Sequence, residues 1–159
     1  MVIVIIFSCL CIIVYQDLRY RHIHIALPII LFFAGIYLLY NNYKDYQISM
    51  VLQNTFFLLL TFGGLLAYMS IKVGKFLNPF QNYFGLGDLL FYLAVTPLFL
   101  LNNYVVFFIS SLIFTVLIYF AGKKNISKNS IPLAGYASLL LIGILMHDVF
   151  STPYLTLIN

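Results

Sequence analysis

Residues 48–71 read ISMVLQNTFFLLLTFGGLLAYMSI, a run without a single charged side chain. A helix needs about 20 mostly apolar residues to cross the hydrocarbon core of a bilayer, so this run is long enough to span one. Five more apolar runs accompany it: Val2–Tyr15, Ile25–Tyr40, Leu89–Leu101, Val105–Ala121 and Ile131–Phe150. The sequence therefore predicts an all-α, polytopic membrane protein, a bundle of about six transmembrane helices.

The composition agrees with lipid as the main solvent. Of the 159 residues, 64% are apolar and only 8% are charged, whereas soluble domains carry roughly 25% charged residues. Six short crossings use up the chain, so we expect a single membrane-embedded domain over residues 1–159. The first run has no Lys or Arg ahead of it, which favours a retained helix over a cleaved secretory signal.

The fourth run is the least certain of the six. Leu89–Leu101 is too short to span a bilayer alone, so we expect its helix to begin earlier, near Tyr83. Only Asn102, Asn103 and Tyr104 separate it from the fifth run, and one long bent helix is the alternative.

The positions of the positive charges predict the orientation of the chain. Seven of the eight Lys and Arg residues lie in the first, third and fifth connections between runs: Arg19, Arg21, Lys72, Lys75, Lys123, Lys124 and Lys128. Positive loops stay cytoplasmic, so both termini are expected on the non-cytoplasmic side. The net charge of +4 is spread over short loops and forms no stripe for nucleic acid. Cys9 and Cys11 point different ways on a helix and are interpreted as packing residues.

The four acidic residues are all aspartates. Asp45 lies in the polar second connection and Asp148 at the outer end of the last run, where solvated side chains are ordinary. Asp17 and Asp88 differ, because the topology places both near the cytoplasmic face at similar depth. Ionisable residues in a membrane protein are costly and tend to be functional.

Two carboxyls brought close together share a proton, because both cannot ionise cheaply. The ionised one can act as a general base on water and the protonated one can donate to a peptide carbonyl. This chemistry needs no metal and no cofactor. Gly85 and Gly87, just before Asp88, would allow a close backbone approach. Taken alone, Gly85–Asp88 is better explained as an ordinary helix start, with Asp88 as N-cap and first-turn acid.

Together these features resemble the type IV prepilin peptidase family, membrane aspartic peptidases of the Gly-X-Gly-Asp kind. The resemblance rests on Asp17-Leu18-Arg19-Tyr20-Arg21-His22-Ile23, on Gly85-Leu86-Gly87-Asp88, and on Ile131-Pro132-Leu133-Ala134-Gly135 at the start of the last run. It covers essentially the whole chain and is closest to the minimal members, which lack the N-terminal region linked to methylation. Two departures, Ile23-His24-Ile25 for Ile-Pro-Asn and Leu90 for a lysine, affect substrate preference more than reaction type.

The resemblance implies an aspartic-type endopeptidase of the plasma (inner) membrane, with Asp17 and Asp88 as the catalytic residues. Its substrate would be a prepilin or pilin-like protein of a type IV pilus or secretion system, cut after a short basic leader at the cytoplasmic face. Arg19, Arg21 and His22 are assigned to the lipid interface, with contact to substrate as the alternative. A small ion- or proton-coupled transporter and a catalytically silent relative remain open, and the oligomeric state is not predicted.

Overall fold

The computed structural model describes residues 2–42, 47–73, 85–122 and 132–151, and this part of the chain is helical without any strand. In chain order the elements are α1 (Val2–Tyr20), α2 (Ala26–Asn42), α3 (Gln47–Val73), α5 (Leu86–Val95), the 3₁₀ helix η1 (Thr96–Leu98), α6 (Leu101–Gly122) and α7 (Leu133–Ser151). The all-α prediction is confirmed for these residues. Asp45, Tyr83 and the lysines of the third and fifth connections other than Lys72 lie outside them.

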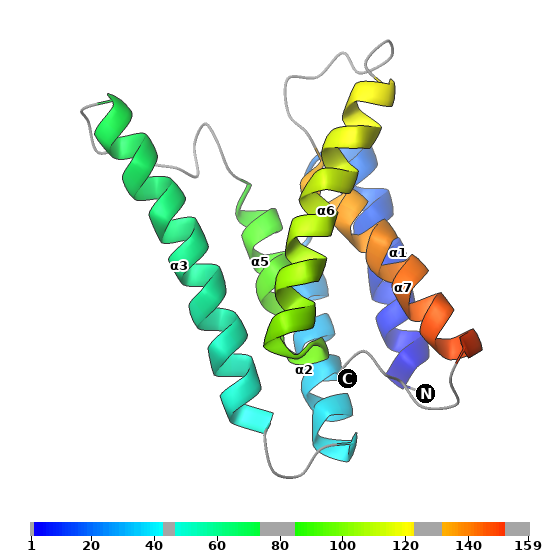
Figure 1. The fold of residues 1–159 in the computed structure, drawn as a ribbon. Coiled ribbons are helices and arrows are strands. Elements are labelled where there is room, and N and C mark those ends of the chain that lie inside the picture. Colours follow the sequence, from blue (N-terminus) through cyan, green and yellow to red (C-terminus); the bar gives the residue numbers. More distant parts are fainter. Residues whose placement is uncertain (1, 43–46, 74–84, 123–131, 152–159) are drawn as a thin grey trace.

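The helices run alternately up and down in a bundle (Figure 1). α1 and α7 lie side by side and antiparallel, α2 packs on α1 and on α5, and α6 packs on α7. α3 stands at the edge and contacts η1 more than any other element. One end of the bundle collects the ends of α1, α3 and α6 and the starts of α2, α5 and α7; we call it the acid end, because Asp17 and Asp88 lie there.

Three helical segments are long and apolar enough to cross a membrane: Val2–Tyr20, Ile48–Lys72 and Leu101–Ala121. The helices over Ala26–Asn41, Leu86–Leu98 and Leu133–Asp148 are apolar but shorter. Large apolar side chains cover the outside of the bundle, among them Phe56 at 68% exposure and Ile71 at 81%. An exposed apolar surface of this extent is typical of a protein surrounded by lipid.

The fourth and fifth apolar runs form two separate helices, and the break lies earlier than the sequence predicted. α5 begins at Leu86, after Gly85 in an extended conformation, and is only ten residues long. It tightens into η1 around Pro97, whose ring cannot continue an α-helix, and Phe99 is extended. Asn102 and its neighbours, expected in the connection, belong to the first turn of α6.

A buried amide from α3 stabilises this break. Asn54 has no exposed surface, and its Nδ2 donates to the carbonyl oxygens of Thr96 at 2.8 Å and Phe99 at 2.6 Å. Irregular backbone at membrane depth is tolerated where protein groups replace the missing hydrogen bonds. Asn54 thus lets α5 end inside the bundle instead of at its far side. Gly35 of α2 provides room there, since a Cβ on it would lie 2.7 Å from Cγ of Pro97.

Tyr104 illustrates how a sequence pattern can mislead. Tyrosines at the ends of apolar runs, such as Tyr15, Tyr40 and Tyr104, are typical of the membrane interface. Tyr15 and Tyr40 are exposed, but Tyr104 has no exposed surface. Its hydroxyl donates to the carbonyl oxygen of Tyr92 at 3.0 Å, and its ring contacts Phe57 edge-on. It therefore belongs to an aromatic core that joins α3, α5 and α6.

Candidate active site at the acid end

The spacing of the inward-facing residues of α1 carries Asp17 into the bundle. Ile6, Leu10 and Ile13 have at most 1% exposure, and Asp17 has 6%. Steps of four, three and four residues keep these side chains on one helical face. The Asp17 side chain thus ends a buried stripe whose other members are apolar. Cys9 is buried and Cys11 exposed, so the two do point different ways, as predicted.

α1 continues to Tyr20, beyond the Tyr15 end of its apolar run, and it stops immediately after the acid. Arg21 adopts φ 59°, and its amide donates to the carbonyl oxygen of Asp17 at 3.1 Å. This is an αL cap, unusual because a residue with a Cβ occupies a conformation that favours glycine. Gln16 steadies the following connection, because its Oε1 accepts from the His24 amide at 3.0 Å.

Asp88 lies in the first turn of α5. Gly85, not Asp88, is the N-cap residue, and the Asp88 carboxylate accepts a hydrogen bond from the Gly85 amide. This is the acceptor half of a capping box. Gly87 faces the first connection, where a Cβ would lie 3.3 Å from Cδ1 of Ile23. The glycines of Gly85–Asp88 therefore serve a tight helix start packed against the residues that follow α1.

The amino terminus of α7 joins the two acids. The Ala134 amide donates to Oδ1 of Asp88 at 2.9 Å, and the Gly135 amide donates to Oδ2 of Asp17 at 2.6 Å. Successive amide nitrogens of a helix lie roughly 3 Å apart, so these two bonds hold the carboxylate oxygens within about 9 Å of each other. The structure thus brings together two acids that are far apart in the sequence.

The amino end of a helix suits this task, because its first amides have no partner in their own helix and its dipole favours negative charge. Each carboxylate thereby gains a charge-assisted hydrogen bond that offsets its burial and the repulsion between the two charges. Gly135 allows the contact: a Cβ there would lie 3.1 Å from Oδ2 and 3.2 Å from Cβ of Asp17. A larger residue would push the acid away.

The basic residues after Asp17 occupy different positions. Arg21 is half-buried and His22 is exposed, and both are close enough for their charges to act on Asp17. Arg19 is exposed and lies over the ring of Tyr20, with Cζ 5.9 Å from the ring centroid. Among the described residues, no group of three His, Cys, Asp or Glu could hold a metal ion.

Two members of the site were not predicted from the sequence as site residues. Ala134 and Gly135 contribute only backbone amides, and no side-chain chemistry marks them. The available signal was Pro132, which precedes the helix and leaves free amides after it. Ile131 itself lies outside the described residues.

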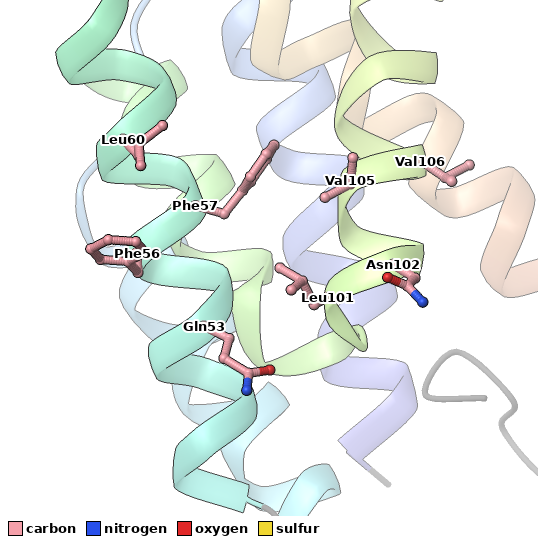
Figure 2. A pocket seen from close by; sticks show the side chains of 8 residues that line it. All are labelled: Gln53, Phe56, Phe57, Leu60, Leu101, Asn102, Val105 and Val106. Carbon is pink, nitrogen blue, oxygen red and sulfur yellow. The ribbon is translucent and has the colours of Figure 1, made fainter.

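The structure also has a groove away from the acid end. Figure 2 shows a groove between α3 and α6 of about 540 Å³, with Phe57 and Leu101 on its walls and Gln53 and Asn102 as its polar members. Its residues come from the first halves of α3 and α6, at the opposite end of the bundle from the acids. The groove is therefore separate from the acid site.

Comparisons with protein-family models, with curated proteins and with solved structures find no match for this chain.

Proposed function

We propose that this protein is a membrane aspartic endopeptidase in which Asp17 and Asp88 form the catalytic pair. The observation that carries the proposal is the pair of hydrogen bonds from Ala134 and Gly135 to the two carboxylates. Two acids that accept hydrogen bonds from successive amides of one helix start indicate a functional pair far more specifically than one acid at a helix end does. Neither capping alone nor chance burial requires both of them in one place.

The chemistry follows from the pair. The ionised carboxylate takes a proton from water while the water oxygen attacks the peptide carbonyl carbon, and the protonated carboxyl gives its proton to the carbonyl oxygen. When the C–N bond then breaks, the proton taken from water passes to the leaving nitrogen, and the carboxylate that gave its proton to the carbonyl oxygen takes that proton back as the carbonyl re-forms. Protons and charges balance without a metal or covalent intermediate. Asp17 is the deeper acid, and Asp88 is half-buried.

The proposed substrate is a prepilin-like protein with a short basic leader before a hydrophobic helix. In this proposal the six α-helices of the described residues all cross the inner membrane, the shorter α2, α5 and α7 included. The acid end faces the cytoplasm and both termini lie on the other side. The support is the positive charge at that end: Arg19 lies in the last turn of α1, Arg21 follows α1, and Lys72 lies in the last turn of α3. A scissile bond just outside the hydrophobic helix of such a substrate would lie at the depth of the acids.

The test is cleavage of a pilin-like protein from the same genome, co-expressed or mixed in detergent and followed by gel shift and N-terminal sequencing. Asp17→Asn and Asp88→Asn should each lower cleavage at least about 100-fold, the usual scale of a lost acid or base. Because an amide oxygen still accepts the α7 amide, both variants should fold. Asp148→Asn, the same change at the far end of α7, should leave cleavage intact. Full activity in either Asp17→Asn or Asp88→Asn would refute the pair.

One observation favours a second candidate, an ion-coupled transporter. α5 is a short helix that ends in irregular backbone within the bundle, and broken helices are common at transporter ion sites. Proton or sodium flux into liposomes containing the purified protein, abolished by Asp17→Asn, would support this alternative. Cleavage of a pilin-like protein without flux would exclude it.

A further inference from the structure

Ser138 carries a buried hydroxyl that none of the contacts above uses. It lies on α7 with no exposed surface, and its Oγ has no hydrogen-bond partner among the described residues. Other helical hydroxyls of this chain bond back to their own helix, as Ser111 does to the Phe108 carbonyl and Thr115 to that of Ser111. A buried hydroxyl without a hydrogen-bond partner lowers the stability of a fold by about 1–3 kcal/mol. A polar partner is therefore expected close to Ser138.

Helix geometry places that hydroxyl under the acid site. Ser138 follows Ala134 by four residues and Gly135 by three, so it lies one turn below both, on the face between them. The Cα–Cβ bond of a helical residue tilts toward the amino terminus. The Ser138 side chain is thus directed toward the turn whose two amides hold Asp88 and Asp17.

Asp17 is the acid that can use another donor. Among the described residues, the hydrogen bond to its carboxylate is the one from Gly135 to Oδ2, and Oδ1 can accept another. Its Cβ and Cγ would lie 3.2 and 3.5 Å from a Cβ built on Gly135, so the carboxyl rests against the turn above Ser138. Asp88 has donors from two helix starts, Gly85 and Ala134.

We propose that Ser138 is a positioning residue of the acid site, whose hydroxyl donates through one bound water to the carboxylate of Asp17. It acts from inside the bundle and orients Asp17 beneath the reacting atoms. The proposal rests on the proposed function for its catalytic meaning, but the hydrogen bond can be measured without cleavage.

The other charged groups near Asp17 are accounted for. Arg21 and His22 follow it on the chain, and Asp88 faces it from α5. α2 carries no acid, lysine, arginine or histidine. Those of α7, His147 and Asp148, lie about four turns from its start. Removing the Ser138 hydroxyl leaves all of these charges unchanged.

The experiment uses the scarcity of acids. All four carboxyl side chains are aspartates, so ¹³Cγ-aspartate labelling of the full chain in detergent gives four resonances, assigned by Asp→Asn variants. Ser138→Ala should move the titration midpoint of Asp17 to higher pH by about one unit, because a donor to the ionised form is lost. Ser110→Ala, which removes a hydroxyl bonded to the Phe107 carbonyl of its own helix, should move it by less than about 0.2 units on the same scale.

An unchanged Asp17 midpoint in Ser138→Ala would overturn the proposal. If that variant does not fold, Ser138→Cys keeps the size with a much weaker donor and should show the same shift. In the cleavage assay Ser138→Ala should lower kcat about tenfold with KM unchanged. Absence of wild-type cleavage would count against the peptidase alone, whereas wild-type cleavage with unshifted midpoints would count against Ser138 alone.

Discussion

Replacing Gly135 by alanine places a methyl group against the carboxylate that this glycine holds. The new Cβ would lie 3.1 Å from Oδ2, 3.2 Å from Cβ and 3.5 Å from Cγ of Asp17. The two shorter contacts, at 3.1 and 3.2 Å, push α1 and α7 apart by a few tenths of an ångström or turn the carboxyl aside. Either movement stretches the 2.6 Å hydrogen bond between the Gly135 amide and Oδ2.

The expected loss of stability is the difference of two opposing effects. A hydrogen bond to a charged group contributes about 1.5–3 kcal/mol, and alanine in place of glycine in a helix returns up to about 1 kcal/mol. Gly135→Ala should therefore lower the free energy of unfolding by about 1–2 kcal/mol. Cleavage should fall at least about tenfold, because Asp17 loses the position that the pair requires.

Gly143 provides a matched control on the same helix. A Cβ on it would meet nothing within 4 Å, so Gly143→Ala should leave stability equal or raise it by up to about 1 kcal/mol. Thermal or denaturant unfolding of both variants in detergent measures the contrast, about 1.5–3 kcal/mol from the estimates above. If Gly135→Ala proved as stable as Gly143→Ala, Asp17 would not rest on Gly135, and the argument for the site would fail.

Three further predictions concern the framework of the site. Asn54→Leu leaves the carbonyls of Thr96 and Phe99 without their donor, so the free energy of unfolding should fall by about 2–4 kcal/mol. Gln53→Leu loses only a 3.4 Å contact to Ser49 and should change the free energy of unfolding little. Equal effects of the two changes would contradict the role of Asn54. Gly35→Ala brings a Cβ to 2.7 Å from Pro97, whereas a Cβ at Gly63 meets nothing within 4 Å. The free energy of unfolding should therefore fall by about 1–3 kcal/mol in Gly35→Ala and not in Gly63→Ala. Unchanged stability of Gly35→Ala would refute the close packing of Gly35 on Pro97. Tyr92→Phe removes the 2.7 Å hydrogen bond to Ser111, which should cost about 1 kcal/mol; an unchanged unfolding midpoint would show that this bond does not hold α5 to α6.

The sequence by itself determined the all-α class of the protein and where apolar helices lie in the described part of the chain. Apolar runs such as residues 48–71 form helices because only internal hydrogen bonding satisfies the backbone in an apolar medium. It also singled out Asp17 and Asp88, because acids are rare in so apolar a chain. Both signals are local, so they can be read without knowing which helices touch.

Only the tertiary structure decided what these residues meet. The end of α5 at Val95 depends on Asn54, which lies 42 residues before Thr96 in the chain, and the burial of Tyr104 depends on its contacts with Tyr92 and Phe57. The acids are joined by the amides of Ala134 and Gly135, and every residue has an amide. Pro132 marks the start of α7 in the sequence, but which groups meet its first amides depends on the packing of α7 against α1 and α5.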